Sequence, residues 1–568
     1  MADQSPNTLD AFFGPRDRST EPELRQRLGI VVGGSLSEGL DVKLDPQIQI
    51  EGLAVGRYVV IQGNTGRRFF SMITDVQLDA LNPLIEKAPP DTRDDFLTQV
   101  YQGTAVFGRV HLSPMLVLEQ DAEEPKPVKS VPAHFAPVYP ATEEEVALIF
   151  GDEREAGFFH IGDPLEMEGV PVALDLHRFV ERSAGIFGKT GTGKSFLTRL
   201  LLAGLIEEQV AVNLVFDMHN EYGWKSQDES SQEVKGLRQL FPGSTVSVFT
   251  LDEKSSRRRD SRFDGVVRIG YDQIEPEDVR SLANLMALSE VQVGALDFLR
   301  RHLGPRWIAR LLDEDDSLED LTPALERGTI HAGTLGAIQR KLGLFRRFGF
   351  LQENVSTDPV QQILDYLDRG KSVVLEFGRY GNSEEAYILV ANYITRRIHR
   401  RYVRRSEEAL GQPGQGPRPL VITIEEAHKF LDPTVARHTI FGTIARELRK
   451  YNVTLLIVDQ RPSGIEPEVM SQIGTRVTCL LDDEADIRAV FSGISGSAAL
   501  REVLARLDTR QQALILGHAV PMPVVVKTRS YDASFYAALG LERIEDAEEQ
   551  LDRGRALLRG DDEESTGI

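Results

Sequence analysis

The stretch that decides the fold is Gly188-Lys189-Thr190-Gly191-Thr192-Gly193-Lys194-Ser195. It has the spacing of a phosphate-binding loop, in which two glycines separated by four residues precede a lysine and a serine. Apolar residues 184–187 before it predict a strand, and leucine-rich residues 196–206 after it predict a helix. This order of strand, loop and helix favours the motif over a chance glycine-rich turn, so the stretch predicts binding of a nucleoside triphosphate.

Each part of this loop has a predicted role toward the nucleotide. Glycines allow the backbone N–H groups of residues 188–195 to surround the phosphates, because a residue without a Cβ permits close approach. Lys194 is expected to reach the β- and γ-phosphate oxygens. The Ser195 hydroxyl is expected to ligate Mg²⁺.

A second predicted element supplies carboxylates. The apolar run 420–424 ends in Glu425-Glu426-Ala427-His428. We predict that Glu425 holds the magnesium shell and that Glu426 orients or deprotonates the attacking water. Because the first position is usually Asp, we expect the longer Glu425 to coordinate through a water. The alternative, two surface acids that open a helix, is disfavoured by the apolar run before them.

Two more apolar runs end in polar residues. Residues 214–216 lead into Asp217-Met-His219-Asn-Glu221, where a structural role is the favoured interpretation and no second histidine supports metal binding by His219. Residues 453–458 lead into Asp459-Gln460. Gln460 is the candidate sensor, because an amide at the end of a neighbouring strand can bond the γ-phosphate or the attacking water.

Two arginines between these acids and Gln460 are candidates for a residue that acts across a subunit interface. They are Arg446 and Arg449. An arginine that reaches a neighbouring subunit's nucleotide would neutralise charge in the transition state, an effect of about 10³–10⁵ in rate in other systems. The alternative is that both are ordinary cations on a helix surface, and the sequence leaves the two interpretations equal.

The bulk composition is that of a large globular protein. The chain has 568 residues, of which 41% are hydrophobic and 27% charged, so we expect two to four domains. Its net charge of −22 argues against a surface that coats itself in nucleic acid, although a local basic lining could still bind it. A single cysteine, Cys479, excludes internal disulfides and cysteine-rich metal sites. We find no apolar stretch long enough to cross a membrane and no secretory signal, and expect a cytoplasmic protein.

The order of patterns along the chain predicts an α/β protein preceded by a β-barrel. Residues 1–25 are a predicted flexible arm, residues 26–125 a small barrel of short strands, and residues 126–156 a linker. Strands and helices then alternate over residues 157–274 and 351–535, which predicts a parallel sheet, and residues 275–350 form a predicted helical insertion. Residues 536–568 are expected to be a helix and an acidic tail. The candidate core strands are 212–217, 372–376, 420–424, 453–458, 477–481, 513–517 and 524–527.

Four motifs together resemble the HerA family of ring-forming ATPases, which are relatives of the FtsK translocases. They are the loop 188–195, the segment 217–222, the Glu-Glu-Ala-His segment 425–428 and the Asp-Gln-Arg-Pro-Ser segment 459–463. Asn220 stands where members of this family commonly have glycine. The resemblance covers most of the chain, and it implies a P-loop NTPase core of the RecA-like, FtsK/HerA type behind an N-terminal barrel of the HAS-barrel type.

The resemblance also implies a function. It implies ATP and Mg²⁺ at the subunit interfaces of a homo-hexameric ring, double-stranded DNA in the central channel, and an interface arginine that Arg449 matches best. Family members work with a NurA-like nuclease in DNA end processing and repair, or with other effectors such as Sir2-like proteins in antiphage defence. The barrel is implicated in docking these partners.

The leading expectation is therefore an ATP-dependent double-stranded DNA translocase or helicase that acts with a partner nuclease or effector. The alternative is a ring scaffold in which ATP controls the assembly of an effector without obligatory DNA travel. A small-molecule kinase is disfavoured because Glu426 is placed to activate water. Two basic segments, residues 254–262 and 396–405, are candidates for DNA contact, and neither is preferred.

Overall fold

The computed structural model describes residues 25–87, 93–119, 125–165, 167–227, 233–243, 245–411, 416–447, 450–494, 498–509 and 511–540. Their Cα positions form two compact units, one from residues up to 149 with 165–170 and 496–503, and one from the remaining residues. The predicted N-terminal arm, apart from Arg25, and the predicted acidic tail after residue 540 lie outside the described residues.

The first unit is a closed β-barrel. Its strands are β1 (Gly29–Ser35), β2 (Gly39–Leu44), β3 (Tyr58–Gln62), β4 (Arg68–Ala80), β5 (Val106–Leu118), β6 (Lys126–Pro127) and β7 (Pro137–Pro140). Six of them form a ring in the order β2-β1-β7-β3-β4-β5, and β5 pairs back onto β2. Side chains alternate between core and surface, so that Val110 and Leu112 of β5 are buried with Val42 and Ile61.

The predicted linker at 126–156 is wrong in part, because it contributes strands to this barrel. β7 pairs with both β1 and β3 and thereby completes the ring, and Val138 at its centre is fully buried. Pro137 and Pro140 occupy the two ends of this four-residue strand, where a missing N–H is tolerated. The barrel also carries the helices α1 (Pro83–Lys87) and α2 (Asp95–Thr104) and the short η3 (Ile50–Gly52).

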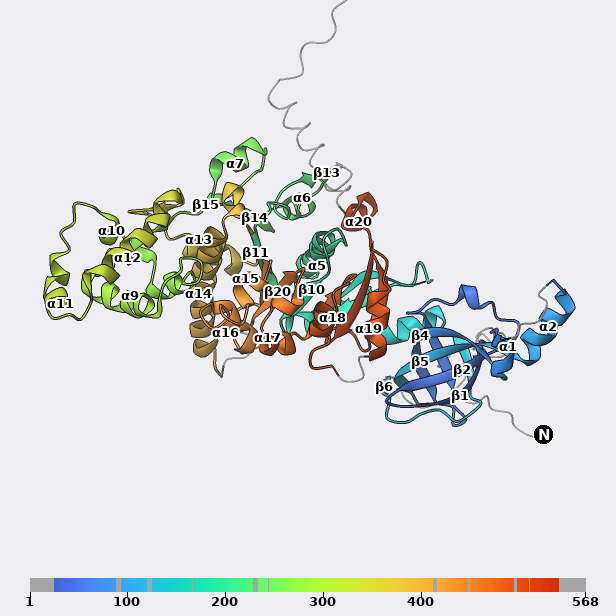
Figure 1. Cartoon of the computed structure of the whole chain (residues 1–568). Coiled ribbons are helices and arrows are strands. Elements are labelled where there is room, and N and C mark those ends of the chain that lie inside the picture. The colour runs from blue at the N-terminus through green and yellow to red at the C-terminus, as the bar shows by residue number, and fades with distance from the viewer. Residues whose placement is uncertain are drawn as a thin grey trace, which may run out of the picture. The chain divides into compact units, whose positions relative to one another are not determined.

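The second unit is built on one sheet of twelve strands (Figure 1). Its order is β15-β14-β18-β11-β19-β20-β10-β21-β22-β23-β8-β9. The strands from β15 to β21 are parallel, and those from β22 to β9 are antiparallel. Their bounds are β8 (Phe158–Pro164), β9 (Val172–Asp175), β10 (Ala184–Phe187), β11 (Val212–Asp217), β14 (Val246–Thr250), β15 (Gly265–Val266), β18 (Ser372–Glu376), β19 (Leu420–Glu425), β20 (Val453–Asp459), β21 (Thr475–Thr478), β22 (Gln512–Gly517) and β23 (Val524–Thr528).

Helices connect and cover the parallel strands, as buried apolar strands require. α5 packs on β10 and β11, α13 on β18 and α16 on β20. The helices of this unit outside the insertion are α4 (Leu176–Val180), α5 (Lys194–Glu207), α6 (Leu237–Leu240), α7 (Glu253–Arg258), α13 (Pro359–Asp368), α14 (Glu384–Glu408), α15 (His428–Leu431), α16 (Ile440–Glu447), α17 (Pro467–Gln472), α18 (Glu484–Val490) and α20 (Ala533–Ala538), with the short η7 (Gly378–Asn382) and η8 (Pro462–Gly464). Two more helices, α3 (Glu143–Phe150) and α19 (Ala498–Ala505), contain a boundary between the units in the sequence.

The helical insertion is present, and Figure 1 shows its helices α9 to α12 in yellow-green. Short parallel strands β16 (Ile269–Gly270) and β17 (Leu351–Gln352) pair where the chain enters and leaves it. Its helices are η4 (Tyr271–Gln273), α8 (Pro276–Arg280), α9 (Glu290–Leu303), α10 (Trp307–Leu312), η5 (Glu319–Leu321), α11 (Thr322–Glu326), α12 (Ala332–Leu342) and η6 (Gly343–Arg347). A separate antiparallel hairpin, β12 (Ser226–Gln227) with β13 (Glu233–Val234), lies outside the main sheet.

The fold confirms the predicted class: an α/β P-loop core with a helical insertion after an N-terminal barrel. Among the residues that the structure describes, no helix combines the length and the apolar character needed to cross a bilayer. The carboxyl ends of β11, β19 and β20 and the loop after β10 lie at the same edge of the sheet, because these four parallel strands are neighbours.

Candidate nucleotide-hydrolysis site

The phosphate loop lies between a buried strand and a helix, as the sequence predicts. All four residues of β10 are buried, and α5 begins within the motif. Gly191 and Gly193 have φ angles of +78° and +92°, which side chains disfavour, so the turn of the loop requires these glycines. A Cβ on Gly188 would lie 2.8 Å from both Cβ of Cys479 and Oγ1 of Thr192. The loop can follow this tight course only because these three positions are glycines.

The two lysines of the loop face different partners. Nζ of Lys194 donates a hydrogen bond of 2.8 Å to the carbonyl oxygen of Lys189 and lines the pocket described below. Burial lowers the pKa of Lys194, an effect that the charge of Glu426 opposes. Nζ of Lys189 instead forms an ion pair of 3.0 Å with the exposed Asp482. Lys194 is thus the cation that the loop offers to a phosphate.

Glu425 is the buried carboxylate of the site. Its Oε1 accepts a hydrogen bond of 2.7 Å from the Tyr222 hydroxyl, whereas its Oε2 is buried without a hydrogen-bond partner among the described residues. Burial, reinforced by the charge of Asp217, raises the pKa of Glu425 to about 8. A buried carboxylate oxygen without a partner suits Mg²⁺ or a water of its shell. With the Ser195 hydroxyl in the same pocket, Glu425 fits the predicted magnesium site.

Asp217 holds the loop that carries Tyr222. Its carboxylate accepts hydrogen bonds from the backbone N–H groups of Glu221 and Tyr222, both at 2.8 Å, and of Gly223 at 3.2 Å. Burial, together with the charge of Glu376 at the end of the adjacent strand, raises the pKa of Asp217 to about 7. The three bonds fold the chain back over the end of β11, so Asp217 acts on the site through the residues that it positions.

A chain of hydrogen bonds connects the phosphate loop to Glu426. The Thr190 hydroxyl donates to Oε1 of Gln460 at 2.5 Å, and Nε2 of Gln460 donates to Oε1 of Glu426 at 2.9 Å. Glu426 follows β19 and Gln460 follows β20, and these strands are paired in register. Glu426 has a left-handed φ of +48°, which is uncommon for a residue with a side chain. The structure therefore places the predicted sensor and the predicted water-activating acid in direct contact.

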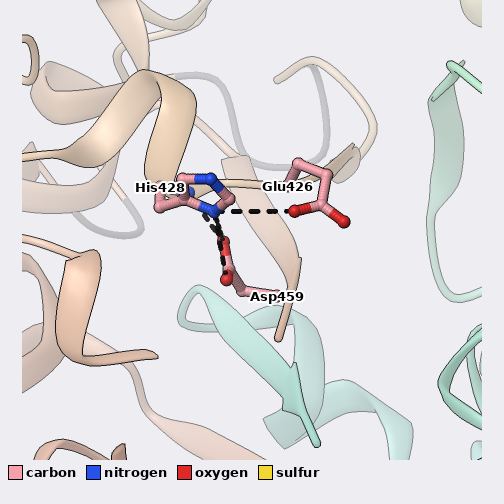
Figure 2. Close-up of side chains that lie close together, drawn as sticks. All are labelled: Glu426, His428 and Asp459. Atoms are coloured by element: carbon pink, nitrogen blue, oxygen red, sulfur yellow. Dashed lines mark hydrogen bonds and ion pairs between the residues drawn. The ribbon is translucent and has the colours of Figure 1, made fainter. Parts of the chain in front are cut away.

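His428 and Asp459 complete this side of the site (Figure 2). Nδ1 of His428 lies 3.0 Å from Oδ2 of Asp459 and 3.6 Å from Oε2 of Glu426. The hydrogen bond with Asp459 raises the pKa of His428. One ligand atom from each of the three residues lies within 4.8 Å of the others, a spacing that could hold a metal ion. However, both oxygens of Asp459 accept hydrogen bonds from His428, and Oδ1 also accepts one of 2.7 Å from the backbone N–H of Arg461.

The loop and the acids open onto one pocket of about 310 Å³. Its lining residues are Thr190, Gly191, Gly193, Lys194, Ser195, Phe196, Arg199, His219, Glu221, Glu425, Glu426, Val458, Asp459 and Gln460. Sequence reasoning misses Arg199, which is buried on α5 and donates a hydrogen bond of 2.8 Å to the carbonyl oxygen of Glu221. No local signal distinguishes such an arginine from an ordinary helix-surface cation. Tyr222 is also missed, although it lies in a motif that the sequence singles out, because its contact with Glu425 depends on the pairing of β11 with β19.

Of the two predicted interface arginines, the structure describes Arg446 and not Arg449. Arg446 is bonded to two acids of the same chain, Glu466 and Glu468, the latter at 3.1 Å, and it does not line the pocket. Arg449 lies outside the described residues. Its role across an interface stays a prediction.

The two basic segments also differ. The helix arginines are largely engaged by acids: Arg396 and Arg397 contact Asp278 of the insertion, Arg400 contacts Glu275 at 3.0 Å, and a further ion pair joins Arg405 to Asp368. These contacts fasten the insertion and α13 to α14. In segment 254–262, Arg259 is bonded to the buried Glu376 at 2.7 Å. The side chains of Lys254 and Arg258 in that segment are exposed.

Comparison with known proteins shows similarity to HerA helicases. The model described as "Helicase HerA, central domain" matches residues 159–398, and the "HAS barrel domain" model matches residues 28–111. The DNA double-strand break repair helicase HerA of Sulfurisphaera tokodaii is 23% identical over 532 residues, which cover 89% of this chain and 93% of the relative. That of Saccharolobus solfataricus is 26% identical over 402 residues, which cover 70% and 73%.

Solved structures resemble the chain only distantly. VirB4 of Thermoanaerobacter pseudethanolicus is 14% identical and covers 68% of this chain and 99% of its own, with a TM-score of 0.45. The two domain matches, by contrast, span the barrel and the first part of the core, and the relatives extend over most of the chain. The chain thus has a HerA-type central domain and a HAS barrel domain, and it is similar to HerA helicases over most of its length.

Proposed function

We propose that this chain is an ATP-hydrolysing motor that moves along double-stranded DNA as a homo-hexamer. The observation that carries the proposal is the hydrogen-bonded chain from Thr190 through Gln460 to Glu426, which holds a carboxylate beside the phosphate loop. Nucleotide binding needs only the loop, whereas hydrolysis also needs a base for water and a group that contacts the γ-phosphate. Both groups line the same pocket as the loop.

Each residue then has a defined task in hydrolysis. The backbone N–H groups of residues 188–195 bind the phosphates, and Lys194 neutralises charge on the bond that breaks between the β- and γ-phosphates. Bound Mg²⁺ supplies further charge neutralisation, with Ser195 and Glu425 as the residues that would hold it. Glu426 accepts the proton of the attacking water, whose oxygen forms the new bond to phosphorus, and Gln460 orients that water.

The action on DNA is inferred from the family. Both named relatives are DNA double-strand break repair helicases. We infer that this chain likewise acts on DNA ends with a NurA-like nuclease, or with another effector such as a Sir2-like protein in antiphage defence. The exposed Lys254 and Arg258 support phosphate contact by segment 254–262. On α14, acids engage Arg396, Arg397, Arg400 and Arg405, which leaves the exposed Arg401 and Arg404 as its candidates for the same contact.

The ATPase part is tested by two substitutions in the full chain. Lys194→Ala should abolish binding of a fluorescent ATP analogue with Mg²⁺, whereas Glu426→Gln should bind it normally and lose turnover. Lys225→Ala is a matched control, because this lysine pairs with Glu233 on the hairpin outside the main sheet. Turnover of Glu426→Gln at the wild-type rate would show that another group activates water.

The DNA part is tested separately from hydrolysis. Double-stranded DNA should stimulate ATP turnover, and the wild-type protein should displace a protein roadblock from DNA while Glu426→Gln does not. Turnover that is slow and indifferent to DNA, combined with nucleotide-dependent capture of an effector, would favour the ring scaffold instead.

A further inference from the structure

One polar unit at the edge of the pocket has no role in the hydrolysis scheme above. The carboxylate of Asp459 is completely buried, and it is satisfied by His428 and by the backbone N–H of Arg461. Oδ2 of Asp459 accepts a hydrogen bond of 2.7 Å from the His428 backbone N–H. Nδ1 of His428 lies 3.0 Å from Oδ2 and 3.2 Å from Oδ1 of Asp459. The Asp459 carboxylate therefore fixes both the backbone and the ring of His428.

The fixed ring lies against the water-activating acid. Gln460 holds Oε1 of Glu426 at 2.9 Å, and Nδ1 of His428 lies 3.6 Å from the other oxygen, Oε2. Figure 2 shows Glu426 and Asp459 approaching the same ring nitrogen. Oε1 of Glu426 is thus held by a hydrogen bond from Gln460, which follows β20. Oε2 lies at ion-pair distance from His428, which opens α15 after β19.

A restraint on Glu426 is needed because other groups compete for it. The charge of Glu426 acts on Lys194 and opposes the lowering of its pKa by burial, so an unrestrained carboxylate would be attracted to the lysine. A salt bridge to Lys194 would neutralise the base and occupy the cation that the phosphates need. The His428 ring, whose Nδ1 lies at an ion-pair distance of 3.6 Å from Oε2 of Glu426, opposes this collapse when the ring is protonated.

We propose that His428, oriented by Asp459, is a positioning residue that holds the Glu426 carboxylate in the orientation required to receive a proton from water. This inference rests on the proposed ATPase function. The hydrogen bond with Asp459 supports it, because it raises the pKa of His428 and so favours the protonated ring that can pair with Glu426. The alternative is a purely structural role, in which Asp459 and His428 only join β20 to the start of α15.

The two interpretations differ in where a substitution acts. His428→Asn places an amide NH₂ near the Nδ1 position, whereas His428→Gln places it near Nε2, one bond farther from the backbone. A positioning role predicts that the Asn variant keeps much of the wild-type kcat. It predicts that the Gln variant loses about 10- to 100-fold in kcat, the scale expected when a catalytic group is misplaced. The KM for ATP should stay nearly unchanged in both, because neither variant alters the phosphate loop.

The experiment measures kcat and KM for ATP with the full chain, together with urea unfolding of each variant. His438→Phe is the control, because His438 is an exposed histidine of the same segment and does not line the pocket. His428→Phe should show the largest loss, and the Asn and Gln pair decides the matter if the Phe variant does not fold.

Three outcomes would overturn the proposal. The first is equal kcat in the Asn and Gln variants, and the second is a change confined to KM or to stability. The third is tight, His428-dependent binding of Zn²⁺ in calorimetry, because the metal would then occupy Nδ1. Failure of the ATPase proposal is recognised separately, since Glu426→Gln would then hydrolyse ATP at the wild-type rate whatever the histidine variants do.

Discussion

The hydroxyl of Tyr222 donates a hydrogen bond of 2.7 Å to Oε1 of Glu425 across 203 positions of sequence, and both side chains are buried. This bond joins the loop after β11 to the end of β19. It also divides the two oxygens of Glu425 between two tasks, because Oε1 is held by protein and Oε2 is left for the metal shell. A second tyrosine, Tyr387, fixes the backbone of Glu425, with its hydroxyl 3.1 Å from both the N–H and the carbonyl oxygen.

Removing the hydroxyl with Tyr222→Phe should lower stability by about 1–3 kcal/mol, because the buried Oε1 loses its donor. ATP turnover should also fall, since Glu425 becomes free to rotate. Urea unfolding and steady-state ATPase assays measure the two effects. Tyr271→Phe is the control, because the Tyr271 hydroxyl makes no hydrogen bond within the described part of the chain, and it should change neither quantity.

The raised pKa of Glu425 predicts a stability that falls as pH rises. In the folded chain the Glu425 carboxyl keeps its proton up to about pH 8. In the unfolded chain the carboxyl loses this proton near its ordinary pKa of 4.5. Between pH 4.5 and pH 8 the unfolded state therefore binds fewer protons than the folded state. The contribution of Glu425 to the free energy of unfolding is present at low pH and is lost as the pH rises through 8. Glu425→Gln cannot titrate. The free energy of unfolding of wild type minus that of the variant should decrease from pH 5 to pH 9, measured by urea unfolding without Mg²⁺. A constant difference would contradict the assignment.

Two glycines in helix interiors should respond oppositely to alanine. A Cβ on Gly204 of α5 would lie 2.6 Å from the ring of Phe159, so Gly204→Ala should destabilise the chain by about 1–3 kcal/mol through overpacking. Gly294 of α9 has open space around its Cβ position, and Gly294→Ala should stabilise by about 0.5–1 kcal/mol through helix propensity. Thermal and urea unfolding of the two variants check the signs, and the same sign for both would refute the packing argument.

The two candidate interface arginines should behave differently. Arg446→Ala should cost only about 0–1 kcal/mol and leave most ATPase activity, because its guanidinium is engaged by Glu466 and Glu468 of the same chain. Arg449→Ala should leave the assembly intact and inactive. Mixing Arg449→Ala with Glu426→Gln subunits checks action across the interface, because some sites would then combine two intact halves and regain turnover. No regained activity at any mixing ratio would argue against that placement.

A buried ion pair fastens the helical insertion to the core. Arg396 donates two hydrogen bonds, of 2.7 Å and 3.1 Å, to the fully buried carboxylate of Asp278. Arg396→Ala should cost about 3–5 kcal/mol, because it leaves a buried acid with much of its charge uncompensated. Arg400→Ala, which removes a more exposed partner of Glu275, should cost far less. Hydrogen exchange of α8 should rise in the first variant only. Equal exchange in both would show that the insertion is held by apolar packing.

Local sequence was sufficient for the phosphate loop and for the polar ends of the strands. The glycines, Lys194 and Ser195 act within eight consecutive residues, so their spacing alone carries the geometry. The runs before Glu425 and Gln460 are apolar because these strands are buried on both faces, and that pattern is readable without knowing the neighbours. Local pattern was insufficient for β7, a four-residue strand that begins and ends in proline. It was also insufficient for α2, which lies between β4 and β5 of the barrel in the sequence.

Tertiary structure alone decided which of these polar groups meet. Tyr222 reaches Glu425, and Gln460 reaches Glu426, because β11, β19 and β20 are adjacent in the sheet although distant in sequence. Strand order is set by crossover connections and not by the residues at the strand ends, so no local pattern encodes it. For the same reason the arginines of α14 resemble a DNA-binding stripe in the sequence, and the folded chain uses Arg396 to bind its own insertion.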